Sequence, residues 1–267
     1  MKFFQKNIFN ALCVTLIILS FAACGDKATF DNTVGVAPDG ALLRFYNAVP
    51  GGPAVVLYNG DTKISATSNT IAYGPDSIIV GAVFPILDYN IVPAGTAKIS
   101  MRLPGSGTTI LSQDLNLTNK SYYSLIAYDT VGAQKFLLVN DDRTAVKNPA
   151  KAYFKIINAV NGISGNGYDF YIKRIGSVAN LVTTLKSFEQ SPYIEYDPFQ
   201  TGGAGNDSLF VRPAGGTANI LSISLNGGVV SSNGFLQPNR IRNIIFRGVA
   251  TGATTIKLSG NSFYYVN

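Results

Sequence analysis

Short runs rich in Val, Ile, Tyr, Phe and Thr follow one another from Ala41 onward, and Gly, Pro, Asn and Asp separate them. No stretch places apolar residues at helical spacing over three turns. β-Branched and aromatic residues favour a pleated, half-buried surface, so each run predicts a strand. In the first half we expect strands near residues 41–49, 54–59, 77–84, 97–103, 121–129 and 134–140. The pattern predicts an all-β fold.

One run, Tyr122–Tyr128, is apolar or aromatic at most positions instead of alternating. A strand with one solvated face alternates between apolar and polar residues, whereas a strand covered on both faces reads as a continuous apolar run. We therefore expect a central strand here, covered on both sides.

The second half of the chain repeats the first. Residues 43–49 (LRFYNAV) return as residues 154–160 (FKIINAV), and the two asparagines are offset by 158 − 47 = 111. The arginine of MRLPG returns in VRPAG at an offset of 212 − 102 = 110. A period of about 110 residues with about seven short strands is typical of an immunoglobulin-like β-sandwich. We expect two tandem β-sandwich domains, at residues 41–146 and 147–267.

The N-terminus has a basic start and then an apolar run from Ala11 to Ala23. A helix needs about 20 apolar residues to cross the hydrocarbon of a bilayer, so this shorter run predicts a cleaved signal peptide over residues 1–23. The letters FAAC that end at Cys24 resemble the lipobox of bacterial lipoproteins, in which the cysteine is acylated before cleavage. The alternative is an ordinary secreted protein whose cleavage site lies near a cysteine.

Lipidation at Cys24 implies an exported protein anchored in the outer membrane, facing the periplasm or the cell surface. Residues 24–40 lack any sustained period and end in turn formers, so we expect them to be a flexible tether.

Hydrophobic residues make up 46% of the chain and charged residues 13%, which indicates well-buried strands. The net charge is +6, and loss of Lys2 and Lys6 with the signal would leave 6 − 2 = +4. These cations are scattered singly, with no basic run that would follow a phosphate backbone. We expect no nucleic-acid partner.

Cysteine and histidine usage excludes several reaction classes. The chain has two cysteines and no histidine. Cys13 lies in the signal peptide, and acylation would remove the thiol of Cys24. Without imidazole, the chain has no Ser-His or Cys-His triad and no histidine ligand for zinc. We expect a protein that is not an enzyme and that needs no cofactor or metal.

Several segments resemble a known family. Residues 44–50 (RFYNAVP), with PAV and YNG shortly after, are similar to the R-V-V-N-A-S-P-D-A-P…V-D-V-Y opening of the bacterial extracytoplasmic domain of unknown function 4397. Residues 92–96 (VPAGT) and the ISMR that follows resemble its V-P-A-G-T-Y-x-V-x-V turn and strand. YYSL at residues 122–125 and LLVNDD at 137–142 are similar to its closing strands.

The second half keeps the Asn-Ala-Val opening and YDFY at residues 168–171, but has TGG at 201–203 in place of Pro-Ala-Gly. It therefore resembles a divergent second copy. The resemblance covers roughly residues 41–260 and implies tandem immunoglobulin-like domains on an exported lipoprotein, with no catalytic residues. Val49, Gly51 and Val56 replace a serine and two aspartates of the motif, so a function that rests on those acids does not carry over.

Carboxylates are the main remaining acids and bases. A glycosidase needs two of them about 5 to 10 Å apart, which Glu189 with Glu195 or Asp197 would supply, although solvated loop positions are the simpler interpretation. Asp141 and Asp142 offer oxygen ligands for calcium, with a polar junction between domains as the alternative. The adjacent pairs Lys120–Ser121 and Lys186–Ser187 are poor dyads, because neighbours on a strand point to opposite faces.

Turn residues account for two further motifs. Asn47 and Asn158 either contact a ligand or, as strand-end asparagines commonly do, bond nearby backbone groups and shape a turn. Gly95, after Pro93 and Ala94, is expected to take a positive φ in a structural turn.

Aromatic residues are the candidate ligand contacts. Exposed tyrosines on rigid loops give contact area to sugars or proteins at low entropic cost, although sandwich cores also take many aromatics. The possible ligand-binding residues lie in a proline-broken segment and at the end of the last strand: Phe188, Tyr193, Tyr196, Phe199, Tyr264 and Tyr265.

The leading hypothesis is a non-catalytic, membrane-anchored envelope lipoprotein that binds or scaffolds an envelope protein or glycan. The alternatives are a carboxylate-dependent glycan hydrolase and a structural subunit of an outer-membrane assembly.

Overall fold

The computed structural model describes residues 39–65, 77–85, 89–145, 147–161, 167–174, 176–197, 207–225, 236, 238–249 and 256–259. These residues belong to one unit of the chain, Pro38–Asn267. None of them forms a helix long and apolar enough to span a bilayer. Apart from a single 3₁₀ turn at Arg143–Ala145, their regular structure is all strand, which confirms the all-β prediction.

The strands up to Asn140 form two sheets. The first inner sheet has the order β4 (Val83–Phe84), β1 (Ala41–Asn47), β8 (Tyr122–Tyr128), β9 (Lys135–Asn140), and β5 (Asn90–Val92) also pairs with β1. The first outer sheet has the order β3 (Thr62–Lys63), β2 (Val56–Asn59), β6 (Gly95–Arg102), β7 (Thr109–Leu117). β1 and β8 run parallel.

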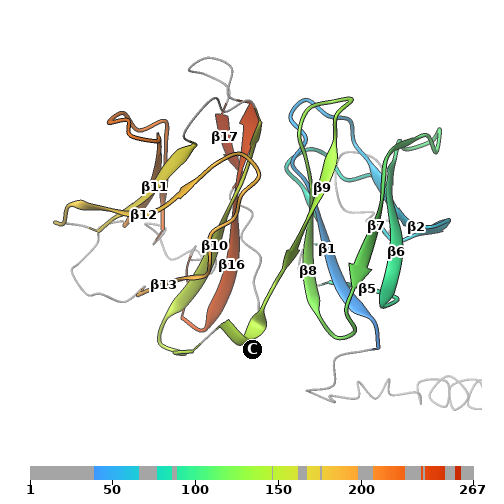
Figure 1. The fold of residues 1–267 in the computed structure, drawn as a ribbon, viewed down its shortest axis with the longest axis horizontal. Helices are drawn as coiled ribbons and strands as arrows, with labels where there is room; N and C mark the ends of the chain where they lie inside the picture. Colours follow the sequence, from blue (N-terminus) through green and yellow to red (C-terminus); the bar gives the residue numbers. More distant parts are fainter. Residues whose placement is uncertain are drawn as a thin grey trace, which may run out of the picture. The chain divides into compact units, whose positions relative to one another are not determined.

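The strands from Ala152 onward have a similar arrangement, although the second inner sheet has four strands where the first has five. The second inner sheet has the order β13 (Ile194–Tyr196), β10 (Ala152–Asn161), β16 (Arg240–Val249), β17 (Ile256–Ser259). The second outer sheet has the order β12 (Ala179–Leu185), β11 (Tyr168–Lys173), β14 (Ser208–Pro213), β15 (Leu221–Ser224). The central pair, β10 and β16, is again parallel. The first half lies on the right of Figure 1 and the second on the left.

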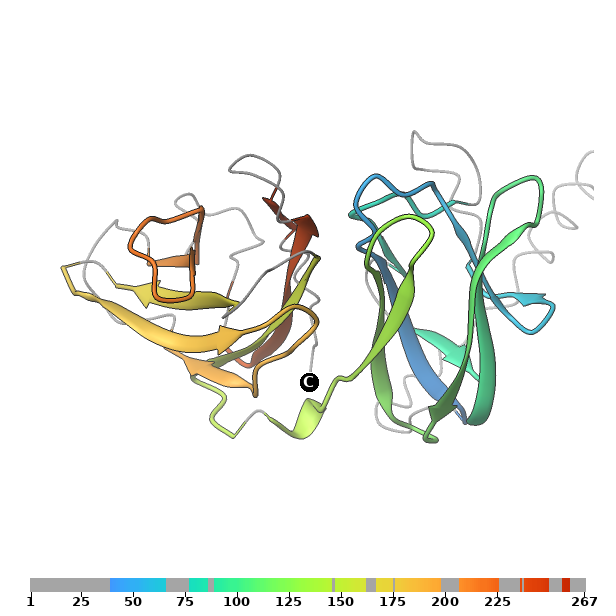
Figure 2. The same ribbon diagram turned by 45° about the horizontal axis from the view of Figure 1, so that its top comes forward.

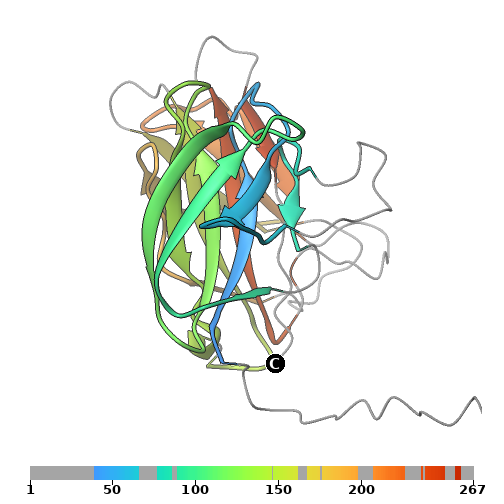
Figure 3. The same ribbon diagram turned by 90° about the vertical axis from the view of Figure 1, so that its right-hand side faces the viewer.

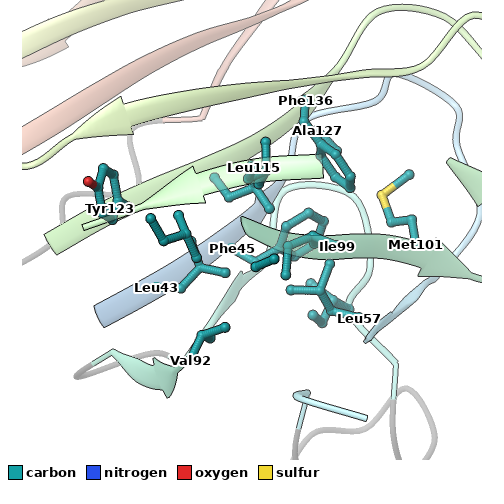
Figure 4. Close-up of a cluster of buried hydrophobic side chains, with 14 of the residues drawn as sticks. Leu43, Phe45, Leu57, Val92, Ile99, Met101, Leu115, Tyr123, Ala127 and Phe136 are labelled. Carbon is teal, nitrogen blue, oxygen red and sulfur yellow. The ribbon is translucent and has the colours of Figure 1, made fainter. Parts of the chain in front are cut away.

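Alternate residues of the two sheets fill the core of the first half. Leu43 and Phe45 of β1 face Ile99 and Met101 of β6, and each of the four is at most 2% exposed (Figure 4). Phe136 of β9 meets Phe45 edge-on, with ring centroids 6.4 Å apart. The period-two alternation of these strands thus builds a β-sandwich.

The core of the second half is built in the same way. Phe246 of β16 meets Tyr168 and Phe170 of β11 edge-on, with ring centroids at 5.2 and 5.6 Å. Leu209 and Val211 of β14 close the same cluster and are fully buried.

The two inner sheets also pack on each other through the faces turned away from their own cores (Figure 2). Five central positions of Tyr122–Tyr128 are buried, which confirms the prediction of a strand covered on both faces. β1 is buried at every position and β10 at all but its last. The buried residues of this third layer are Tyr46, Ala48, Ile126, Val139, Tyr153, Ile157, Ala159, Ile241 and Ile245.

Corresponding positions of the two halves meet in this layer. Tyr46 and Ile157 are related by the repeat offset of 111, and they pair in register with Ile126 and Ile245 of the adjacent parallel strands. All four belong to the third layer. The contact therefore resembles the isologous interface of a homodimer, formed within one chain.

A buried carboxylate joins the halves at this interface. Asp141 follows β9 and is 2% exposed. It accepts hydrogen bonds from Tyr89 Oη at 3.1 Å, Ser124 Oγ at 2.6 Å and Asn243 Nδ2 at 2.7 Å. Asn243 belongs to the second half, and its amide also donates to Ser124 Oγ at 3.2 Å.

The two motif asparagines have the same structural role. Asn158 is fully buried, and its Nδ2 donates to the carbonyls of Leu185 and Lys186 at 3.1 and 2.9 Å. Its Oδ1 accepts from the backbone N–H two residues later, and Asn47 makes the same three kinds of bond. The prediction that these side chains bond the backbone is confirmed.

Two other sequence predictions concern turns. Gly95 has the expected positive φ, 103°, at the start of β6. The strand predicted at 77–84 is wrong over most of its length, because only Val83–Phe84 is a strand and Ile78 forms a single bridge to Val55. Gly81, at φ 87°, turns the chain inside this apolar run.

Candidate functional site: an aromatic platform

An aromatic pair lies on the solvent-facing side of the second outer sheet. Because Tyr168 and Phe170 of β11 point into the core, Tyr171 points outward. Its register partner on β14 is Phe210, and the two rings stack with centroids 5.6 Å apart and planes 13° from parallel. Neighbouring strands thus hold the two rings in nearly parallel planes.

Arg212 extends this stack. It lies two residues after Phe210 on β14, and hence on the same face. Its Cζ is 4.7 Å from the centroid of Tyr171 and 5.0 Å from that of Phe210. Its Nε donates to Asn219 Oδ1 at 2.8 Å, which uses one of the five guanidinium N–H donors. The guanidinium is therefore oriented by two rings and one amide.

Leu181 of β12 completes the apolar part of this surface. It pairs in register with Tyr171 from the other side, at a bulge in β12, and is 54% exposed. Phe210 is 4% exposed although it faces outward, so its neighbours cover it. We call Tyr171, Leu181, Phe210 and Arg212 the aromatic platform.

The charge of this face is positive. Lys173 follows Tyr171 by two residues and is exposed on the same side. Asp169 also faces outward, but its carboxylate accepts from Thr184 Oγ1 at 2.6 Å and from Gly215 N at 2.9 Å. The carboxylate thus holds β11 to β12 and to the turn after β14.

The platform offers flat apolar area next to cationic hydrogen-bond donors. Stacked aromatic pairs add about 0.5–1.5 kcal/mol beyond their area burial, and a cation over a ring adds about 0.5–1 kcal/mol at an exposed site. The stack is therefore preorganised, so a flat ligand would not have to order it. The four side chains of the platform include no carboxylate, and the nearby Asp169 carboxylate is hydrogen-bonded to Thr184 and Gly215.

The aromatics predicted from the sequence lie elsewhere. Tyr196 is not an exposed loop residue, because it lies in β13, is 2% exposed and donates to Asp207 Oδ2 at 2.7 Å. The proline-broken segment thus includes a strand, and Tyr196 faces its core.

Phe188 and Tyr193 lie at the contact between the halves. Phe188 has φ 68° and packs on Tyr128 of the first half, with ring centroids 4.4 Å apart. Tyr193 lies under Lys155 Nζ, which is 4.4 Å from its ring centroid. Burial raises the pKa of Tyr193, and the charges of nearby aspartates raise it further.

Four of the predicted site residues, Cys24, Phe199, Tyr264 and Tyr265, lie outside the described residues. The structure places none of the remaining predicted aromatics on the aromatic platform.

The candidate hydrolytic carboxylates have structural partners. Glu189 accepts from the backbone N–H of Lys186 at 2.8 Å, and Glu195 accepts from Tyr153 Oη at 2.7 Å. Asp197 forms an ion pair with Lys151. Burial and the bond to Glu195 both raise the pKa of Tyr153.

The carboxylates of Asp141 and Asp142 both accept hydrogen bonds from nearby protein groups. Asp141 holds the interface bonds, and Asp142 Oδ1 accepts from Thr144 N and Oγ1 at 2.8 and 2.6 Å at the start of the 3₁₀ turn. In the described part of the chain, three or more metal-ligating side chains do not come together. Lys155 Nζ donates to the carbonyl of Asn140 at 3.2 Å, and burial lowers its pKa while the two aspartates oppose that shift.

The sequence predictions did not include Tyr171 or Arg212, although Arg212 lies in a segment of the internal repeat and Tyr171 in a segment that resembles the family motif. The signal was available in the alternation of β11 and β14. A tyrosine and an arginine fall on the outward side of these strands, next to core residues on the inward side.

The solved structures that resemble this chain include two distant likenesses. A carbohydrate-binding module of family 26 from Eubacterium rectale, solved with maltoheptaose, is 11% identical with a TM-score of 0.24, over 84% of this chain and 95% of that one. A candidate adhesin from Bacteroides ovatus is 11% identical with a TM-score of 0.27, over 86% and 97%. At these TM-scores neither likeness bears on the function of this chain.

Comparison with sequences gives one family. No curated protein matches the chain. Residues 41–164 match the family described as "Domain of unknown function (DUF4397)", and the match covers the first half and continues through β10. This chain therefore contains one copy of the DUF4397 domain.

Proposed function

We propose that this protein is a membrane-anchored lipoprotein of the cell envelope that acts as a non-catalytic binding module for an acidic glycan. The observation that carries the proposal is the preorganised stack of Tyr171, Phe210 and Arg212 on a solvent-facing sheet. The aromatic platform is the proposed binding surface.

The chemistry of the platform favours a sugar with a negative group. Sugar rings present apolar C–H faces that pack on an aromatic ring, and Tyr171 and Leu181 supply that area. A guanidinium matches the two oxygens of a carboxylate or phosphate in one plane. The carboxylate of Asp169 is hydrogen-bonded to Thr184 and Gly215, and the positive charges of Arg212 and Lys173 on the same face outweigh its single negative charge.

Three further features belong to the proposal. Acylation of Cys24 would tether the binding module to a membrane. The absence of histidine from the sequence removes the commonest general base. We also propose that the second half is a divergent copy of the DUF4397 domain, supported by its similar strand order, by the parallel central pair in each inner sheet and by the corresponding asparagines.

Binding is tested with residues 25–267, titrated with polygalacturonate, alginate and neutral dextran. We expect the acidic polymers to bind and dextran not to bind. Tyr171→Ala and Arg212→Ala should each weaken binding about tenfold or more, equivalent to about 1.4 kcal/mol. Val178→Ala is the matched control, because Val178 is 79% exposed and lies outside the platform. Equal binding by all three variants would contradict the proposal.

The competing proposals have their own measurements. A hydrolase would release reducing ends from the same polymers and lose that activity in Glu189→Gln and Glu195→Gln. A subunit of an outer-membrane assembly would co-purify with one stoichiometric protein from envelope extracts. Added soluble glycan would not compete with that co-purification. Fatty-acid labelling with protease shaving of intact cells, compared between the native chain and Cys24→Ala, tests the anchor and the side it faces.

A further inference from the structure

The first outer sheet carries a pair like that of the platform. Arg102 of β6 lies over Tyr58 of β2, with Cζ 4.2 Å from the ring centroid. Tyr58 pairs in register with Ser100, two residues before Arg102, just as Tyr171 pairs with Phe210, two residues before Arg212. The arginine-over-tyrosine pair therefore occurs at the same place in both halves.

The side chains of this second pair also face solvent. Leu57 and Met101, the neighbours of Tyr58 and Arg102 along their strands, belong to the core. Tyr58 and Arg102 consequently point outward by alternation. Figure 3 views the molecule from this side, with β2, β6 and β7 toward the viewer.

The orientation of Arg102 is fixed by its own loop. Its Nη2 donates to the carbonyl of Gly60 at 2.7 Å and lies 3.4 Å from Asp61 Oδ1. Its Nε donates to Ser100 Oγ at 3.3 Å. The Asp61 side chain is fully exposed, so this ion pair is open to solvent and to competition by another anion.

Two lysines lie on the strands next to Tyr58 and Arg102. Lys63 pairs in register with Tyr58, and Lys98 lies on the same outward face as Arg102. Exposed Asp114 faces Lys98 across the strands. The face keeps a positive balance beside one aromatic ring, which is the chemistry of the platform on a smaller scale.

The two surfaces point in opposite directions. The inner sheets pack on each other through the third layer, so each outer sheet lies on the far side of its own half. The views of Figures 1 and 2 agree, with β2 and β6 on one side and β11 and β12 on the other. A ligand on one surface would not obstruct a ligand on the other.

We infer that Tyr58 and Arg102 form a second site for the same acidic glycan, so that one molecule of this protein cross-links two glycan chains. The inference rests on the proposed function of the platform. The second site is the weaker one, because it has Ser100 in place of Phe210 and because Asp61 competes for the guanidinium.

The test uses residues 25–267 and measures two quantities: the number of glycan-binding sites per chain and the ability of one chain to cross-link glycan-coated beads. Calorimetry with a short oligogalacturonate should give two sites per chain of unequal affinity. Tyr58→Ala should retain only the site on the aromatic platform. The double variant Tyr171→Ala, Arg212→Ala should retain only the site at Tyr58 and Arg102. Agglutination of beads coated with polygalacturonate should require both sites and should be lost in either variant, although each still binds the beads.

Asp61→Asn is the matched gain-of-function variant. Asp61 is fully exposed, so we expect its replacement to preserve the fold. The weaker site should tighten about threefold or more at low salt, because a competing charge is removed. An unchanged weaker site in Asp61→Asn would contradict the role of Arg102.

The outcomes separate the two proposals. A single site in the native protein, lost with Tyr171→Ala, overturns the second site and leaves the platform standing. Absence of binding by the native protein overturns the platform and the cross-linking together. Two sites that both survive Tyr58→Ala overturn the assignment of the second site to this pair.

Discussion

Asn243 of β16 donates through Nδ2 to Asp141 Oδ1 at 2.7 Å, and this bond joins the two halves of the chain. The acceptor also holds Tyr89 and Ser124, so a single carboxylate satisfies three donors at a buried interface. A buried donor that loses its acceptor costs free energy that a solvated donor does not.

Asp141→Ala tests this cluster. We expect the free energy of unfolding to fall by about 3 kcal/mol or more, because three donors would be left without their acceptor. Asp114→Ala is the control, since it removes the same charge from an exposed strand position and should change stability by about 0.5 kcal/mol or less. Urea unfolding measures both, and equal effects would show that the cluster does not stabilise the interface.

Asn158→Ala tests the connection between β10 and the loop after β12. The loss of a fully buried amide with three backbone bonds should cost about 2–4 kcal/mol, since two carbonyls and one N–H lose their partner. Asn180→Ala, at an exposed position of β12, should cost far less. Thermal unfolding measures both variants. Equal unfolding midpoints for Asn158→Ala and Asn180→Ala would contradict the structural role of Asn158.

Tyr193→Phe tests the pH dependence of stability. Burial raises the pKa of Tyr193 above its unfolded value of about 10, so the folded chain keeps a proton that the unfolded chain loses. The stabilisation is complete below pH 10 and is lost as the pH rises above it, by up to about 1.4 kcal/mol per pH unit.

The variant lacks this proton and should lose less stability between pH 10 and 11 than the native chain. Urea unfolding at pH 8, 10 and 11 measures the difference. Parallel pH profiles for the two proteins would show that Tyr193 is not held in its neutral form.

A fragment of residues 39–146 tests the third layer. Without the second half it would expose Tyr46, Ala48, Ile126 and Val139, which are buried in the whole chain. Because corresponding positions meet at this interface, the exposed patch should pair with a second copy of itself. We expect concentration-dependent dimers by sedimentation, abolished by Ile126→Asp. A monomer as stable as the whole chain would argue against the interface.

Local patterns determine most of what the sequence could predict. β8 combines three tyrosines with Ile126, β1 has leucines and two aromatic residues, and β6 has the β-branched residues Thr96 and Ile99. These residue types favour strands, and all three predicted runs are strands in the fold. The strand prediction was wrong for the apolar run before Val83–Phe84. Gly81 turns the chain there, although the side chains alone predict a strand.

The sequence did not predict which strand faces are buried, because burial depends on strand pairing between distant segments. Arg44 reads as a surface cation, yet it is 1% exposed, with its Cζ 4.6 Å from the ring of Tyr89. Tyr196 reads as a loop aromatic and is in the core. Which face of a strand is solvated depends on the register between distant segments, and that register set both the third layer and the aromatic platform.

The parallel pairing at the centre of each half has a consequence for how the chain matures. Leu42 pairs with Tyr122 and Ala152 with Arg240, so the partners are 122 − 42 = 80 and 240 − 152 = 88 residues apart. A nascent chain that emerges from a ribosome or a translocation channel in sequence order cannot close either central sheet until its far strand is out. Each half must stay open until nearly all of it has appeared, which gives holding chaperones a long interval in which to act.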